Sequence, residues 1–538
     1  MRIWARVFSV VALVGVLFLP WSAPSEAGDD VATSGTYVAD LGFRPNVNGF
    51  AFENYGSEAA VTNLTSVEMR RIFGDVVCAS TAKGKCTLTP EAQEWMAAQN
   101  EGMGGGHCEG FAALSLLMFT GRAKPSDFGA ASIGALTLDG NQKLQREIAL
   151  WYATQAADPT QAAEIRDKTP SEILDLLAKG LGSGQTFDMG IYEPGYGGGH
   201  AIVPYAVEDR GSGLFWILVY DNNYPNAVRA VEVDRGANTW RYSGSTNPNE
   251  PEAEYKGDAT TYTLTLTPNE VRLGQHDCNF CNDAAAGRAP GLAAPAARYN
   301  EVWNEGDGHL MIVDAQGNRL GLVAGKVVNE IPGAQFGPQK HASPTTWSEQ
   351  IDPSFRVPVG TAFTVTIDGT GLKKPGKTDI IMVGPGHDLA LTGVTVRPGA
   401  SDTLKLSPDG ASLTYQTKDD QSPTIQLGWD GKSADYAFWV KGAAMKGGGT
   451  ITVALDTAKM QLSVATTGTS APGTYALGVE RIDDQDDLSF SHDGVALTSG
   501  DTAFVSFGSW KGGADTIPLG IDHGTKGSID QTIDLTAD

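Results

Sequence analysis

A run of alanine, proline and glycine near the middle of the chain separates two halves with different hydrophobic patterns. This linker, residues 284–299, carries little apolar surface that could be buried. Before it, helical and strand periodicities both occur, whereas after it almost every apolar run alternates. A chain of 538 residues is also too long for one ordinary hydrophobic core. The sequence therefore predicts at least two domains of different class.

The first half, residues 28–283, carries helix signals first and strand signals later. Thr65 to Glu68 forms a capping-box pattern, and Thr89 and Thr169 each precede a proline at a helix start. Apolar residues with helical spacing predict helices over residues 90–99, 108–119 and 143–157 and after residue 170. Alternating apolar residues predict strands over residues 186–193, 200–208, 214–221, 227–234 and 261–267. This order predicts an α+β domain.

The second half is predicted to be all-β. Its alternating runs are divided by Gly, Asp-Gly and Pro turns, as in β-sandwiches, and glycine is abundant over the whole chain, at 66 residues of 538. The length suits one large sandwich or two small ones. With two, the division falls near residue 398, giving a β-rich domain over residues 300–398 and a β-sandwich over residues 399–538.

The first 27 residues resemble a signal peptide. Arg2 and Arg6 precede an apolar stretch over residues 7–21, and Ser25 and Ala27 occupy the −3 and −1 positions of a small-residue cleavage site. We expect cleavage after Ala27 and a secreted or extracytoplasmic protein; an uncleaved anchor is the alternative. Thiols of an exported protein meet an oxidising environment.

The chain has five cysteines, so two disulfides would leave one cysteine unpaired. Cys78 and Cys86 enclose a short polar loop, and Cys278 and Cys281 form a CNFC motif, so both pairs are predicted to be disulfides. Cys108 then remains free. The alternative for the CNFC segment is zinc bound through His276, Cys278 and Cys281, but a structural zinc site needs four ligands. We expect no metal and no cofactor.

Cys108 has the surroundings of a nucleophile. It follows three glycines and begins an apolar helix, whose N-terminal N–H groups stabilise a thiolate. Further along, His200 opens a strand and Asp221 ends the next one. A hairpin turn centred on residues 210–211 would pair His200 with Asp221 and Val207 with Leu214, and directly opposed side chains are close enough for a histidine–carboxylate hydrogen bond.

The segments GGHCEGFAALS, GGGHAIVPYAVED and WILVYDNNYP together resemble papain-like cysteine peptidases, and most closely the bacterial group that includes bacteriocin-processing peptidases. The resemblance covers about Leu41 to Leu266. It implies a papain-like fold and amide hydrolysis through an acyl-enzyme: Cys108 attacks the carbonyl, His200 protonates the leaving amine and Asp221 orients His200. Asn223 is the alternative third member of the triad.

One feature departs from that family. Its oxyanion-hole glutamine usually stands about six residues before the nucleophile, where this chain has Gly102. Gln99 and Asn100 are the nearest candidates for the oxyanion donor. His107, next to Cys108, is expected at the surface or on the substrate side rather than as the base. Glu109 is expected to be a favourable acid at the helix N-terminus.

These features predict an exported cysteine peptidase that acts on a peptide or protein substrate, while the β domains position it or bind a cell-surface or wall ligand. The alternatives are a catalytically silent papain-like fold in an adhesion or binding protein, and a transglutaminase-like or cell-wall amidase activity. The net charge of −24 argues against nucleic acid as a partner, because little positive charge is present to neutralise phosphates, and no nucleic acid is expected. No membrane contact is expected after signal cleavage.

Overall fold

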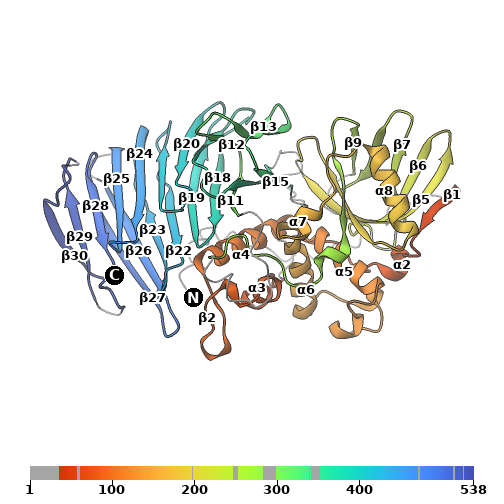
Figure 1. Cartoon of the computed structure of the whole chain (residues 1–538), viewed down its shortest axis with the longest axis horizontal. Helices are drawn as coiled ribbons and strands as arrows, with labels where there is room; N and C mark the ends of the chain where they lie inside the picture. Colours follow the sequence, from red (N-terminus) through yellow and green to blue (C-terminus); the bar gives the residue numbers. More distant parts are fainter. Residues whose placement is uncertain are drawn as a thin grey trace, which may run out of the picture.

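The computed structural model describes residues 35–56, 61–196, 198–245, 252–282, 298–338, 340, 352–469, 473–512, 515–524 and 526–538. The predicted signal peptide and nearly all of the predicted linker lie outside these residues. Tyr299, assigned to the linker above, begins the first strand of the second half. The two halves have the predicted classes, since the first mixes helices and strands and the second is all-β (Figure 1).

The helices of the described residues all lie in the first half of the chain. They are α2 (Pro45–Asn48), α3 (Ser66–Phe73), α4 (Pro90–Gly102), α5 (Cys108–Phe119), α6 (Gln142–Ala153), α7 (Thr160–Ala163) and α8 (Pro170–Gly182). The predicted capping box at Thr65 is formed, Thr89 caps α4, and Thr169 makes a second capping box at α8. Each cap binds N–H groups that the first helical turn leaves without partners, so these helix starts are fixed locally.

The strands of the first half form an antiparallel sheet. Its order is β10 (Leu264–Pro268), β4 (Phe187–Tyr192), β5 (Gly199–Gly211), β6 (Leu214–Tyr220), β7 (Arg229–Asp234), β8 (Thr239–Gly244) and β9 (Ala253–Asp258), with β1 (Thr36–Asp40) paired to β5. The short strands β2 (Cys78–Ser80) and β3 (Thr87–Leu88) pair separately. The five predicted strands all occur, and β1, β2, β3, β8 and β9 are additional.

The second half consists of two large antiparallel sheets. One has the order β15 (Gln335–Gly337), β16 (Ser354–Pro358), β11 (Tyr299–Gly306), β18 (Gly376–Gly384), β19 (His387–Val396), β22 (Thr424–Trp429), β23 (Asp435–Lys441), β26 (Gly473–Ile482) and β27 (Asp487–Leu497). The other has the order β14 (Lys326–Asn329), β13 (Arg319–Val323), β12 (His309–Asp314), β17 (Phe363–Asp368), β20 (Ser401–Leu406), β21 (Ser412–Gln416), β24 (Met445–Asp456), β25 (Gln461–Thr469), β28 (Thr502–Ser506), β29 (Ile517–Asp522) and β30 (Gln531–Leu535).

Both of these sheets continue across residue 398. Strand β17 pairs with β20, and β19 pairs with β22, so hydrogen-bonded ladders join the parts on either side of the suggested division. A single hydrophobic core, from Val302 to Leu535, fills the space between the sheets. These ladders fit the alternative of one large sandwich, because a domain boundary is crossed by few contacts.

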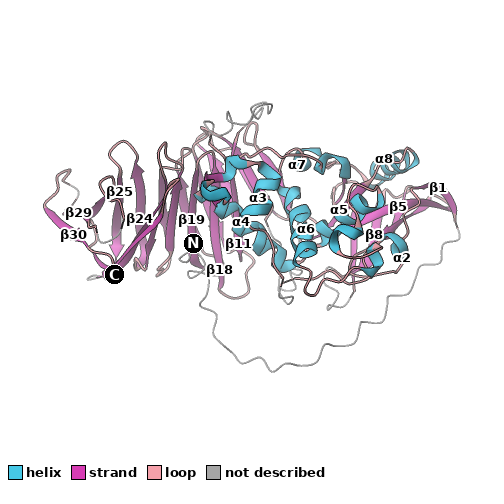
Figure 2. Cartoon of the chain, turned by 90° about the horizontal axis from the view of Figure 1, so that it is seen from below, coloured by secondary structure: helices cyan, strands magenta, loops and turns pink. Residues whose placement is uncertain are grey.

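The two halves also pack against each other. Helix α4 lies on β18 and β19, and Trp95 of α4 shares a core with Phe280 and with Ile381 of β18. Seen from below, α3, α4, α6 and α7 lie between the N-terminal sheet at one end and the C-terminal sheets at the other (Figure 2). Lys340, which follows β15 in the chain, also reaches the first residue of α5, Cys108.

Candidate active site

Cys108 is the first residue of α5 and the only cysteine of the chain outside a disulfide. Its side chain is completely buried. Helix α5 packs one face on β5 and the other on α6, where Gly110 allows the close approach because a Cβ there would lie 2.1 Å from the Ile148 carbonyl oxygen. The thiol is therefore held firmly at the N-terminus of a buried helix. Its Sγ lies 3.4 Å from the carbonyl oxygen of Lys340, to which the protonated thiol can donate a hydrogen bond.

His200 and Asp221 are in direct contact. His200 Nε2 lies 2.8 Å from Asp221 Oδ1, and both side chains are buried. Asp221 accepts two further hydrogen bonds, from the Tyr242 hydroxyl at 2.5 Å and from the Asn223 N–H at 2.8 Å. Three donors around one buried carboxylate fix its position and satisfy its charge.

The charges of this group are strongly coupled. Burial opposes the imidazolium of His200, but Asp221 and the neighbouring Cys108 outweigh it and raise the pKa of His200 to about 10. Burial also opposes the Asp221 carboxylate, yet His200 and Tyr242 lower the pKa of that carboxyl. His200 Nδ1, the nitrogen not used by Asp221, makes no other hydrogen bond of standard geometry and is left for the interaction with Cys108 that also raises the pKa of His200. At neutral pH the arrangement holds a protonated imidazole beside the thiol.

The predicted hairpin register is wrong, although the predicted contact is present. Strand β5 runs to Gly211, so the turn falls at Ser212 and Gly213, both with positive φ. Val207 consequently faces Ile217 rather than Leu214.

Two register shifts within β5 then bring Val203 opposite Tyr220, which is where the ladder ends. Continued in this register, the ladder would place Asp221 diagonal to His200 on the same face instead of directly opposite. Diagonal neighbours in a sheet are within reach of side chains as long as these.

The two asparagines after Asp221 support the site. Asn223, the alternative third member, gives its N–H to Asp221 and its side-chain amide to the Ser245 carbonyl at 2.5 Å. Asn222 Nδ2 donates to the carbonyl oxygens of Cys108, at 3.2 Å, and Ala201, at 2.9 Å. Asn222 therefore joins the start of α5 to β5, a role that sequence reasoning missed.

His107 is not at the surface, contrary to the prediction. It is fully buried, and its ring nitrogens bond to the Tyr55 carbonyl at 2.8 Å and to Asn63 Oδ1 at 2.9 Å. Burial lowers the pKa of His107 to about 4, so the ring is neutral at pH 7. Its two nitrogens are already engaged, and the histidine paired with a carboxylate beside the thiol is His200.

The two oxyanion candidates lie near the end of α4. Asn100 uses its side chain on the Leu64 backbone, accepting the N–H at 2.9 Å and donating to the carbonyl at 3.2 Å. Gln99 is buried with its side-chain oxygen unpartnered. In the part of the chain that the structure describes, neither side chain is hydrogen-bonded to Cys108.

Two polar side chains near α6 were not found from the sequence. The Tyr152 hydroxyl is buried without a partner, and burial together with the nearby Cys108 and Glu109 raises the pKa of Tyr152. Gln155 is buried just beyond α6 and accepts the Lys340 N–H through Oε1 at 2.7 Å. No local sequence motif identifies Tyr152 or Gln155 as part of the site, because only tertiary packing brings them near Cys108 and Lys340.

Both predicted disulfides are present, Cys78–Cys86 and Cys278–Cys281. The second uses the two thiols that the zinc alternative required, while His276 Nε2 lies 3.0 Å from the Thr160 hydroxyl. Within the described ranges, no cluster of His, Cys, Asp or Glu is arranged to hold a metal ion. Two disulfides are typical of an oxidising, extracytoplasmic environment. Among the same residues, no helix is long and apolar enough to cross a bilayer.

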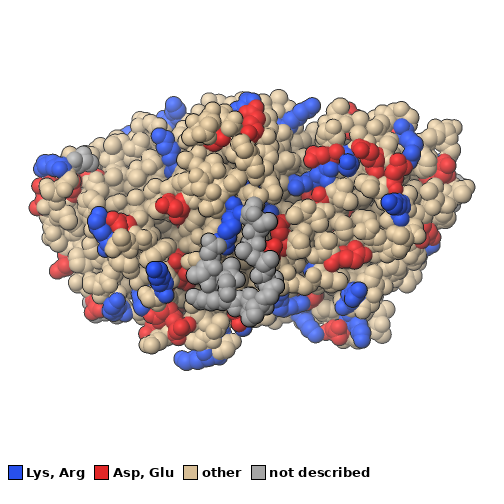
Figure 3. All heavy atoms as spheres, viewed as in Figure 1, with Lys and Arg blue, Asp and Glu red and all other residues tan. Residues whose placement is uncertain are grey.

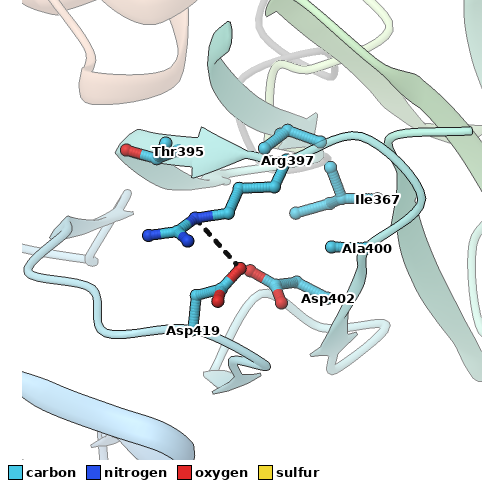
Figure 4. A pocket seen from close by; sticks show the side chains of 7 residues that line it. Ile367, Thr395, Arg397, Ala400, Asp402 and Asp419 are labelled. Carbon is cyan, nitrogen blue, oxygen red and sulfur yellow. Dashed lines mark ion pairs between the residues drawn. The ribbon is translucent and has the colours of Figure 1, made fainter. Parts of the chain in front are cut away.

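A small pocket in the all-β half is lined by Ile367, Thr395, Val396, Arg397, Ala400, Asp402 and Asp419 (Figure 4). Arg397 Nε lies 3.5 Å from Asp419 Oδ2, and Asp402 accepts hydrogen bonds from Tyr415 and from the Lys418 N–H. On the face in Figure 3, basic and acidic side chains are scattered among each other rather than gathered by sign. The buried group at Cys108 is therefore the strongest candidate site.

The comparisons with protein-family models, curated proteins and solved structures find no match for this chain.

Proposed function

We propose that this protein is an exported cysteine peptidase of papain-like type that hydrolyses peptide or amide bonds through Cys108, His200 and Asp221. The single observation that carries the proposal is the contact between His200 and Asp221 beside the free thiol at a helix start. A thiolate paired with an imidazolium is the form in which cysteine attacks a carbonyl. The high pKa of His200 supports that ion pair at neutral pH.

Each neighbouring residue has a part in this mechanism. Cys108 attacks the substrate carbonyl and forms a thioester, while His200 gives its proton to the departing amine. Water then attacks the thioester, and His200 accepts a proton from that water. Asp221, held by Tyr242 and Asn223, keeps His200 protonated in the resting state. The Cys108 N–H and the unpartnered Tyr152 hydroxyl are the proposed oxyanion donors.

A second candidate function is a catalytically silent scaffold for binding through the β half. The complete burial of Cys108 favours it, because a substrate cannot reach the thiol while the Lys340 carbonyl oxygen contacts it. Acyl transfer to an amine, as in a transglutaminase or an amidase that remodels cell walls, stays an alternative within the enzyme class. It shares the same acyl-enzyme and differs only in the acceptor.

The test is alkylation of the full chain with iodoacetamide between pH 5 and 8. Cys108 is the only free thiol, so the site of labelling is unambiguous. An ion pair keeps the rate high at pH 6, where an ordinary thiol is almost fully protonated. His200→Ala should slow labelling at pH 6 by at least about tenfold. His523→Ala, at an exposed histidine that also contacts an aspartate, is the matched control and should change nothing.

Because Cys108 is covered, the deciding quantity is the dependence of the rate on pH rather than its absolute value. Burial of Cys108 lowers every rate in a pH series, whereas an ion pair changes how the rate depends on pH. A wild-type profile that follows free cysteine would refute the peptidase proposal and favour the scaffold.

A further inference from the structure

The backbone of Lys340 fills the space in front of the Cys108 thiol. Its carbonyl oxygen lies 3.4 Å from Cys108 Sγ, and its N–H donates to Gln155 Oε1 at 2.7 Å. The carbon of a substrate carbonyl must come to about 3–3.5 Å from a nucleophile before it is attacked. The Lys340 oxygen already lies at this separation from Sγ, and Cys108 has no exposed surface elsewhere. A substrate therefore cannot react while Lys340 is in this position.

The side chain of Lys340 is bound by residues of the first half. It is only 3% exposed, and its Nζ lies 3.0 Å from Asp188 Oδ1 and 3.1 Å from the Thr267 hydroxyl. The carboxylates of Glu109, at 3.4 Å, and Glu164, at 3.7 Å, complete its surroundings. Burial opposes the positive charge, but the three carboxylates outweigh it and raise the pKa of the Lys340 ammonium. The side chain is therefore held as a cation at any physiological pH.

The three carboxylates depend on this ammonium for their charge balance. Arg272, fully buried, pairs with Asp188 and with Glu109, and Arg166 lies 3.6 Å from Glu164. In the described part of the chain, two guanidinium groups thus face three acids, and the ammonium supplies the third positive charge. Removing one partner from a buried ion pair leaves an uncompensated charge, which is strongly unfavourable. The position of Lys340 is therefore specific to a cation.

Strand β15, which ends three residues before Lys340, is bound to the first half as well. The Phe336 carbonyl oxygen accepts a 2.5 Å hydrogen bond from Arg166, whose guanidinium also lies 5.0 Å from the centre of the Phe336 ring. The centres of the Phe336 and Tyr196 rings are 5.5 Å apart. The contacts of β15 and those of the Lys340 side chain together hold the Lys340 backbone against Cys108.

We propose that Lys340 is an inhibitory residue built into the chain, which keeps Cys108 and His200 in a latent form by placing its carbonyl oxygen against the thiol. The inference rests on the proposed function and concerns the regulation of the same site. The ion pairs of the ammonium stabilise the latent form, so a chain without this charge exposes the thiol more often. The complete burial of Cys108 is then a property of the latent form and not of a site without activity.

Replacing Lys340 by glutamine tests the inhibitory contact. Glutamine keeps an unbranched polar side chain but removes the charge that the three acids bind. Alkylation of Cys108 by iodoacetamide at pH 7 should become at least about tenfold faster, since losing one partner of a buried ion pair shifts an equilibrium by more than this factor. Glu164→Gln removes the longest of the three ionic contacts, at 3.7 Å, and should give a smaller acceleration.

Arg356→Gln is the matched control. Arg356 is another buried cation of the all-β half that pairs with the first half, and its guanidinium lies 3.1 Å from Asp158. Its described contacts are with Asp158, Ala156 and Glu301 and do not include Cys108. This variant loses an ion pair between the halves, as Lys340→Gln does, but the rate of Cys108 alkylation should stay close to that of wild type.

Chemical denaturation shows whether each variant is folded, and Glu164→Gln decides if Lys340→Gln is not. Unchanged alkylation rates in the folded variants would overturn the inhibitory role of Lys340. An equal acceleration in Arg356→Gln would also overturn it, because the loss of any ion pair between the halves would then expose the thiol.

The failure of this inference differs from the failure of the proposed function. A Lys340→Gln protein that is alkylated no faster, while wild-type Cys108 keeps the pH profile of an ion pair, overturns the inhibition and leaves the peptidase proposal standing. Faster alkylation of Lys340→Gln with the pH profile of free cysteine overturns the peptidase proposal, and the inhibitory role with it, because no activity is then restrained.

Discussion

Replacing Asp221 by asparagine removes the charge that keeps His200 protonated and preserves the size of the side chain. Asp221 is the largest favourable influence on the pKa of His200, which stands at about 10. Without it, burial should bring the pKa to its ordinary value of about 6.5 or below. The fall is more than three units, or roughly 5 kcal/mol at about 1.4 kcal/mol per unit.

The consequence is a change of protonation at neutral pH. In wild type the imidazolium persists through pH 7, whereas in Asp221→Asn the ring should be mostly neutral and unable to stabilise a thiolate. Alkylation of Cys108 at pH 6 should therefore fall by at least about tenfold. Tyr242→Phe, which keeps the carboxylate but removes its 2.5 Å hydrogen bond, should give a smaller decrease.

Two measurements check this reasoning. Nuclear magnetic resonance titration of His200 gives its pKa directly, and alkylation from pH 5 to 8 gives the effect on the thiol. Asp501→Asn is the matched control, because Asp501 contacts the exposed His523 at 2.6 Å. An Asp221→Asn protein that is folded and is alkylated within twofold of wild type at every pH would refute the coupling of Asp221 to Cys108.

Three further predictions concern other parts of the chain. Tyr152→Phe should reduce kcat of peptide hydrolysis by about 10²-fold if its hydroxyl stabilises the oxyanion, with little change in Cys108 alkylation. Replacing Cys78 and Cys86 by serine should lower the free energy of unfolding by roughly 2–3 kcal/mol in chemical denaturation, since this disulfide closes a short loop. Burial raises the pKa of Glu94 to about 8 and of Asp388 to about 7, so both bind protons more tightly in the folded protein. Stability should fall as the pH rises from about 4 to 8, and Glu94→Gln should flatten that dependence, as measured by denaturation at pH 5 and pH 8.

The sequence determined the features that depend on neighbouring residues. Thr65, Thr89 and Thr169 fixed helix starts because a capping side chain binds the N–H groups of its own helix. Alternating apolar residues identified the strands, because side chains of a strand point to opposite faces. The count and spacing of cysteines identified both disulfides and left Cys108 free.

Only the tertiary structure decided which distant groups meet. The shifts within β5 moved the register that simple turn counting predicts, because a local irregularity in one strand changes every later partner. Tyr242 joins Asp221 from a strand whose relevance no local pattern reveals.

Lys340 lies 232 residues beyond Cys108 and reaches it because the two halves pack together. Sequence patterns record the preferences of a chain segment, whereas an active site depends on packing between segments that have no pattern in common.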